Sequence, residues 1–325
     1  MRFGWTADQV ALREAVRDLL ASACPPSVVR AAWPGGDESS VEALWSALTG
    51  MGIPGAVGEL GLDEVDLVSL LEETGYAAVP LPVVETAAVA APLLAATGDP
   101  GGHLPGILAG RTRVAVAGGL VPYGRRATLV LHLDGPAAWL STLDGAVDET
   151  TVDGSLAAVR VPKPSGEPLT EDAELVGLAA DRLALGAAAQ LVGLGRRMLD
   201  LTVGYVRERR QFGVPVGSFQ AVKHHLADAL VRLEFAAPAV YAAAWALAGR
   251  RPERGRDVST AVLLATEAAR EAARTAIQCH GAIGYTVEYD LHLYAKRAWA
   301  VAATCDTDAH LARVAEALDL KGAAA

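Results

Sequence analysis

Cysteine, basic charge and long apolar runs are all scarce in this sequence of 325 residues. The three cysteines, Cys24, Cys279 and Cys305, are widely spaced and lack CxxC or nearby Cys/His ligand spacing, which predicts reduced thiols and no metal site. No uninterrupted apolar stretch reaches membrane-spanning length, because the Ala-rich run at 85–97 is short and contains a proline.

The net charge of the sequence argues against nucleic acid as a partner. The formal net charge is −10 and the pI is near 5.2, whereas nucleic-acid binding needs a clustered basic surface. The opening segment is amphipathic and acidic from Asp8 onward, unlike a signal peptide. We therefore expect a cytoplasmic protein that binds neither nucleic acid nor membrane.

Hydrophobic periodicity predicts a mainly α fold with a small β insert. Thr6 is a candidate N-cap, and apolar residues recur at helical spacing around 7–20, 41–51, 62–76 and 83–96. The stretches TRVAVAG, ATLVLHLDG and LAAVRVP are short, rich in Val and Leu, and bounded by turn residues, which is typical of strands.

Helical spacing returns after the linker KPSGEPLTEDAEL and predicts four long helices. They are expected at 180–208, 219–249, 258–279 and 291–318, packed antiparallel through Ala/Leu stripes. The predicted domains are an N-terminal helical domain (1–108), a shortened middle β domain (109–166) and a C-terminal four-helix bundle (167–325).

Two segments carry residues suited to a dinucleotide. The first is RERRQFGVPVGSFQAVKHHLAD (207–228), where arginine guanidinium groups suit pyrophosphate oxygens and two phenylalanines suit an adenine or ribose. The second is QCHGAIGYTVEYDLHLYAKRA (278–298), where a glycine would let the backbone approach a phosphate closely. The alternative for the first segment is a helix–turn–helix corner with a solvated arginine and core phenylalanines.

Both segments resemble signature regions of acyl-CoA dehydrogenases. The patterns R-x-x-F-G-x-P-x-x-x-F-Q and Q-x-x-G-x-x-G-(Y/F)-T-x-E occur here in the family's order, with Ala282 where a second glycine is usual. The resemblance implies the family's helix–β–helix fold and FAD bound at a subunit interface. The cofactor-binding residues that it implies are Arg209, Gln211, Phe212, Phe219, Gln220, Gln278 and Gly281.

The family's chemistry needs a carboxylate base, and this chain departs from the usual pattern there. A carboxylate removes the α-proton of an acyl-CoA thioester while the β-hydrogen leaves as hydride to the flavin. Cys305 stands at the position of the usual glutamate, with Asp306 next to it. Some members carry the base before an arginine early in the bundle, which here is Asp181. The alternative for Asp181 is a residue at a helix N-terminus that interacts with the helix dipole.

The middle segment lacks the family's Trp-Ile-(Thr/Ser) element beside the flavin ring. With the short length, this resembles the small subunits of actinobacterial heteromeric acyl-CoA dehydrogenases that act on steroid-derived CoA thioesters. The resemblance implies an acyl-CoA substrate, a larger partner subunit in a heterotetramer or self-association, and an electron-transfer flavoprotein as acceptor. Two alternatives stay open: a catalytically silent structural subunit, and a flavin monooxygenase of the same fold.

Three histidines and one glutamate near these motifs are expected to have structural roles. His224, His225 and His280 are expected to pack or to hydrogen-bond the loop, and Glu288 to orient it.

Overall fold

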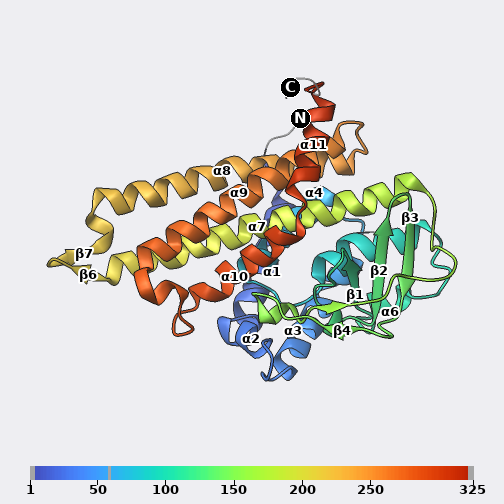
Figure 1. The fold of residues 1–325 in the computed structure, drawn as a ribbon, viewed down its shortest axis with the longest axis horizontal. Coiled ribbons are helices and arrows are strands. Elements are labelled where there is room, and N and C mark those ends of the chain that lie inside the picture. Colours follow the sequence, from blue (N-terminus) through green and yellow to red (C-terminus); the bar gives the residue numbers. More distant parts are fainter. Residues whose placement is uncertain (1–3, 58–59, 321–325) are drawn as a thin grey trace. The chain divides into compact units, whose positions relative to one another are not determined.

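The computed structural model describes residues 4–57 and 60–320, so the first three residues of the opening segment lie outside it. Helices dominate and the strands are few and short, which confirms the predicted fold class (Figure 1). The chain divides into two compact units. One contains Met1–Leu71 and Val79–Gly186, and the other contains Glu72–Ala78 and Ala187–Ala325.

The first unit contains the N-terminal helices. They are α1 (Ala7–Ala23), α2 (Pro26–Ala31), α3 (Ser39–Gly50), α4 (Glu64–Tyr76, whose last turn belongs to the second unit), a π-helical segment Val84–Ala90, α5 (Ala91–Ala96) and α6 (Leu104–Leu108). Thr6 is the predicted N-cap of α1: its hydroxyl accepts from Gln9 N at 3.2 Å, and its own N donates to Gln9 Oε1 at 3.0 Å. Helical spacing therefore located the start of α1 correctly.

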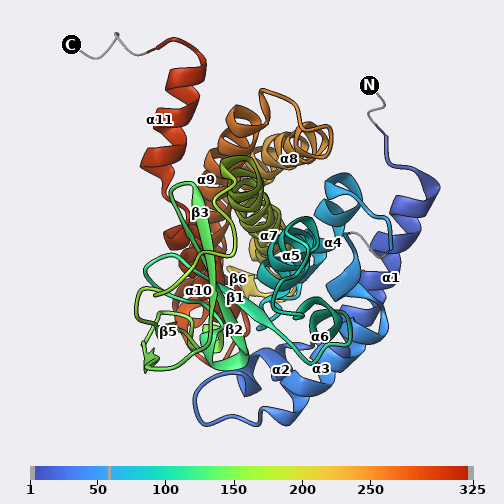
Figure 2. The ribbon, with the colours of Figure 1, turned by 90° about the vertical axis from the view of Figure 1, so that its right-hand side faces the viewer.

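The β insert contains one three-stranded sheet and one short ribbon. Strand β1 (Val114–Ala117) pairs in parallel with β2 (Leu129–Asp134), which pairs antiparallel with β3 (Ala137–Ser141) (Figure 2). Strands β4 (Val147–Asp148) and β5 (Val159–Arg160) form the ribbon. A small core of Ala115, Val121, Val130 and Val159 holds the insert together. Strands β1 and β2 lie within the predicted stretches TRVAVAG and ATLVLHLDG and fill most of each. In the third predicted stretch, LAAVRVP, only the two residues of β5 form a strand.

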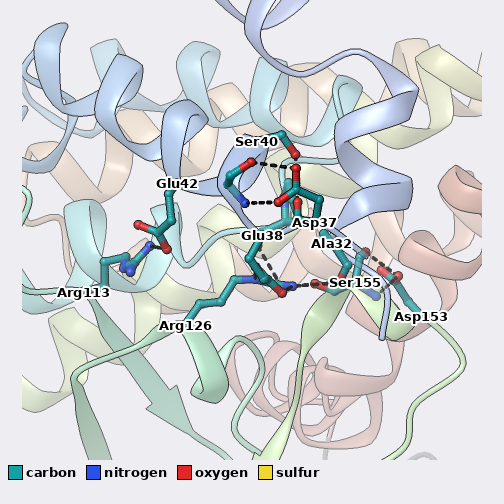
Figure 3. A network of polar contacts seen from close by, with 11 residues as sticks. Ala32, Asp37, Glu38, Ser40, Glu42, Arg113, Arg126, Asp153 and Ser155 are labelled. Carbon is teal, nitrogen blue, oxygen red and sulfur yellow. Dashed lines mark hydrogen bonds and ion pairs between the residues drawn. The ribbon is translucent and has the colours of Figure 1, made fainter. Parts of the chain in front are cut away.

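A buried arginine ties the β insert to the N-terminal helices within the first unit (Figure 3). The Arg126 side chain is 4% exposed and donates from Nε and a terminal nitrogen to Glu38, at 2.9 and 2.6 Å. Its terminal nitrogens also donate to the backbone carbonyls of Ser155 and Ala32, at 2.6 and 2.7 Å. One guanidinium thus satisfies acceptors from three separate segments.

Replacing Arg126 with leucine is expected to destabilise the protein by about 3 kcal/mol, because buried carbonyls would lose their donor. The control is Arg125→Leu, since Arg125 is 61% exposed and pairs with Asp148 at the surface. That variant should cost less than about 1 kcal/mol. Chemical denaturation of both variants checks the prediction, and equal losses would contradict the role given to Arg126.

The second unit is an all-helical bundle with a short hairpin. Its helices are α7 (Ala173–Glu208, from Ala187 onward), α8 (Gln220–Ala248), α9 (Arg254–His280), α10 (Leu291–Thr304) and α11 (Thr307–Ala317). The prediction of a single helix at 291–318 is wrong, because Cys305 and Asp306 are not helical and separate α10 from α11. The Asp306 carboxylate accepts from Ala309 N at 3.0 Å and so begins a new helix.

Helix α7 begins seven residues before its predicted start at 180. The Asp172 carboxylate accepts from the backbone N of Glu174 and Leu175, at 2.9 and 3.2 Å, and caps the first turn. Asp181 therefore lies inside the helix. Its interpretation as a helix N-terminal residue is wrong.

Small residues let the segment Glu72–Ala78 lie directly against α7 within the second unit. A Cβ added to Gly193 would lie 1.9 Å from the Glu72 carbonyl oxygen, and one added to Gly75 would lie 2.2 Å from the Gln190 carbonyl oxygen. Both neighbours are backbone atoms, which cannot rotate away. Glycine is therefore required at this crossing by close packing.

Gly193→Ala is expected to destabilise the protein by about 2 to 3 kcal/mol, because the added methyl overlaps backbone. Gly204→Ala in the same helix is the matched control, since nothing lies within 4 Å of its added Cβ. Alanine there should stabilise the helix by up to about 1 kcal/mol. Thermal unfolding checks both variants. If this packing is correct, the change in unfolding free energy has opposite signs for Gly193→Ala and Gly204→Ala, whereas the same sign for both would contradict it.

Two helices, α7 and α8, are long and apolar enough to cross a membrane by length and composition alone, although the sequence analysis found no such uninterrupted stretch. Of their most apolar windows, 61% and 44% of the residues are buried inside the structure. Core helices of globular bundles pass the same test, so this is weak evidence for a membrane span.

Candidate functional site

A strained hairpin projects from the end of the bundle where α7 ends and α8 begins (Figure 1). Strand β6 (Arg210–Gln211) pairs with β7 (Val214–Pro215) across a two-residue turn. Both turn residues have positive φ, +53° at Phe212 and +82° at Gly213, as a tight hairpin turn requires. For phenylalanine this left-handed conformation costs on the order of 1 kcal/mol. Such strain at an exposed tip is typical of a functional contact.

The aromatic side chains of this hairpin face solvent. Phe212 is 93% exposed, and its ring meets the half-exposed Phe219 ring edge-on, with centroids 6.3 Å apart. The alternative in which these phenylalanines belong to the core is therefore wrong for Phe212. An exposed aromatic pair of this kind marks a surface for a ligand or a partner.

All seven residues that the resemblance assigned to a cofactor are exposed and lie in the second unit. Among the described residues, no side-chain hydrogen bond or ion pair engages the polar members of this set, which are Arg209, Gln211, Gln220 and Gln278. The neighbouring Arg210 guanidinium, in contrast, donates to Gly213 O at 3.4 Å within the hairpin. The set offers one cation and three amides that are available to a ligand.

The turn after α9 depends on glycine for its backbone conformation. Gly281 has φ +65° and ψ −143°, a region closed to residues with a Cβ. Open space surrounds it, since nothing lies within 4 Å of an added Cβ. The next residue, Ala282, is exposed, so its methyl group meets no crowding within the chain.

A stack of three rings joins the two predicted motifs. The Tyr205 ring, one turn before Arg209 on α7, stacks on the His280 ring with centroids 4.3 Å apart and an interplanar angle of 22°. Tyr289 packs against both rings, at 5.9 and 4.9 Å. The hairpin and the Gln278–Gly281 turn therefore occupy the same end of the bundle. Neither tyrosine was singled out from the sequence, because no local spacing links residues so far apart.

The structure separates the three histidines near the motifs. His224 and His225 are exposed on the first turns of α8, so burial does not support a packing role for them. His280 is buried, at 5% exposure, and its Nδ1 lies 2.7 Å from Ala276 O. Glu288 is exposed, and its role in orienting the loop stays a prediction.

Cys305 is unsuited to act as a base. Burial raises the pKa of its thiol to about 11, and its Sγ donates to Val301 O at 3.4 Å. The thiol therefore stays protonated near neutral pH. Asp306 is occupied as the cap of α11. None of the three cysteines, all within the described residues, forms a disulfide.

Asp181 is a buried carboxylate in the first unit, with 2% exposure. The adjacent Arg182 donates from Nε to Glu64 Oε1 at 2.7 Å, an ion pair between α7 and α4 that the sequence analysis did not predict. This pair borders a small hollow of about 10 Å³, which is otherwise lined by Val57, Leu67, Val68, Leu71, Ala88 and Leu185. Asp181 is not one of its lining residues.

Comparison with known proteins agrees with this fold and these motifs. The sequence model of the family described as "Acyl-CoA dehydrogenase, C-terminal domain" matches residues 175–305. The chain is 34% identical over 295 residues to the acyl-CoA dehydrogenase IpdE2 of Mycobacterium tuberculosis, covering 88% of this chain and 89% of that one. The protein belongs to the acyl-CoA dehydrogenase family.

Solved structures extend the likeness to the whole fold. One chain of the ChsE4-ChsE5 complex from Mycobacterium tuberculosis matches with a TM-score of 0.86 and 24% identity, covering 98% of this chain and 99% of that one. A steroid ACAD, Tcur3481-Tcur3483, matches with a TM-score of 0.80 and 25% identity, covering 98% and 99%.

Proposed function

We propose that this chain is a subunit of an FAD-dependent acyl-CoA dehydrogenase that desaturates a steroid-derived acyl-CoA thioester between its α and β carbons. The observation that carries the proposal is the exposed set at one end of the bundle, whose polar side chains have no partner among the described residues. Names of similar proteins supply the substrate class: one is a steroid ACAD, and others are acyl-CoA dehydrogenases.

The residues present fit the ADP half of FAD. The Arg209 guanidinium offers a planar fork for pyrophosphate oxygens, and the exposed amides of Gln220 and Gln278 offer both donors and acceptors. Phe212 and Phe219 provide ring faces for an adenine or ribose. When bound, the flavin supplies the acceptor for the hydride. The side chains named here bind and orient, and none of them transfers a proton.

A partner chain is part of the proposal. The β insert has three strands in its sheet and two in its ribbon, none longer than six residues, and residues 109–166 do not contain the Trp-Ile-(Thr/Ser) sequence that the family resemblance places beside the flavin ring. We therefore assign the flavin-ring wall to a larger subunit in a heterotetramer; the similar ChsE4-ChsE5 protein is likewise a complex of two different chains. An electron-transfer flavoprotein as acceptor stays a prediction.

Asp181 is the residue that we assign to proton removal. Its side chain is 2% exposed, so bulk water does not compete with a substrate for it. A second candidate function is a catalytically silent subunit. The protonated Cys305 thiol at the position of the usual glutamate favours it.

Arg209→Ala and Phe212→Ala are each expected to weaken FAD retention by about 1 to 3 kcal/mol, with folding unchanged, because each loses one contact made only with the ligand. The control is Phe235→Ala, which removes an exposed phenylalanine (73%) from α8 outside the hairpin. Flavin content of the purified complexes measures the effect. Unchanged flavin in both hairpin variants would remove the proposed site.

A further inference from the structure

His280 lies between the two motifs that the proposed function uses, and it is held in one orientation. Its Nδ1 lies 2.7 Å from Ala276 O, so Nδ1 carries the proton and donates to that carbonyl. The other nitrogen, Nε2, is buried and has no hydrogen-bond partner among the described residues. The ring therefore presents one used donor and one unused acceptor.

The rings on either side of His280 come from different elements. Tyr205 belongs to the last turns of α7, while Tyr289 follows the turn after α9. The Tyr205 hydroxyl also reaches the His280 backbone carbonyl at 3.5 Å. The stack thus connects the helix that leads into the hairpin with the last helical turn of α9, which carries Gln278, and with Gly281 directly after it. This segment is called the Gln278–Gly281 turn.

We propose that His280 is a positioning residue, which in its neutral form fixes the Gln278–Gly281 turn against α7 and so aligns it with the Arg209 hairpin for one dinucleotide. The inference rests on the proposed function and deepens it. His280 itself is buried at 5% exposure, and it acts only through the backbone that it holds.

Neutrality of the ring gives the proposal a pH dependence. Burial lowers the pKa of His280 below its usual value of 6.5, because protonation would place a charge and an unpaired Nε2–H among tyrosine rings. A lowered histidine pKa means that the stack is fully stable above 6.5 and loses stability as the pH falls below it. The charged groups nearby are Glu208, Asp290 and Arg197, which act on Tyr289.

The test uses the full chain co-expressed and purified with its larger subunit, because the isolated chain is expected to be flavin-free, and each complex is measured with and without FAD. His280→Leu removes the aromatic stacking and the Nδ1 donor, whereas His280→Phe keeps a ring that cannot be protonated. Hydrogen exchange of the backbone amides of residues 278–285, normalised for intrinsic rates, measures how well this segment is protected. That measurement needs no bound cofactor. Flavin fluorescence gives the Kd for FAD.

We expect His280→Leu to lose protection in this turn and to bind FAD about two- to tenfold more weakly, the loss of about one ring pair. His280→Phe should restore both. Between pH 7.5 and 5.5 the parent should lose protection while His280→Phe does not, and the neighbouring charges are identical in both proteins. Equal pH profiles, full protection in His280→Leu, or lost protection with unchanged FAD affinity would overturn the proposal. If no protein binds FAD, the proposed function fails, and the amide data still decide whether His280 holds the turn.

Discussion

Asp181→Asn is expected to lower the turnover of the assembled dehydrogenase by about 100- to 10,000-fold while FAD content stays unchanged. The amide keeps the size and most hydrogen-bonding positions of the carboxylate, but it cannot accept the α-proton of the thioester. Asp181 is not one of the residues proposed to contact the cofactor, so the substitution removes none of those contacts. Steady-state kinetics and flavin content, measured on the same preparation, check both parts.

The matched control for this variant is Asp172→Asn in the same helix. Asp172 caps α7 through the backbone N of Glu174 and Leu175, and asparagine caps equally well. This variant should therefore retain both activity and stability. If Asp181→Asn instead loses stability and keeps its turnover, the base lies on the partner chain, and the catalytically silent function is correct for this subunit.

The second large effect concerns flavin loading. The chain purified alone is expected to be flavin-free, and the chain co-expressed with its larger partner is expected to carry flavin. The physical reason is that the residues proposed for the ADP half of FAD are exposed in this chain, whereas we assign the flavin-ring wall to the larger subunit. Stoichiometric flavin binding by the isolated chain would contradict this division of the site.

Helical spacing predicted most of the fold because the buried faces of the helices repeat regularly. The predicted helix boundaries were wrong where an aspartate N-cap, and not the spacing of apolar residues, determines where a helix begins. Asp172 begins α7 seven residues before the predicted start, and Asp306 interrupts a predicted helix at 291–318. Both are aspartates followed by helix-forming residues, so a search for N-caps would have found them. The domain boundaries at 108 and 166 stay predictions.

The sequence predicted only those residues of the candidate site that lie close together within one motif. The motifs identified Arg209 and Gln278 because the residues of each motif are close in sequence. The stacking of Tyr205 on His280 joins positions 75 residues apart, and the Arg182–Glu64 ion pair joins positions 118 apart. Such contacts depend on how the helices pack, which one sequence does not reveal. The seven cofactor assignments themselves remain predictions until a flavin is measured.

The most direct test of a shared flavin site is the amount of FAD per polypeptide. The chain would be co-expressed with its larger subunit, the complex purified to homogeneity, and FAD quantified by absorbance after release. We expect one FAD for every two dissimilar chains, because each proposed site combines the ADP-half contacts of this chain with the flavin-ring wall of the other. One FAD for every copy of this chain in a homo-oligomer would contradict it.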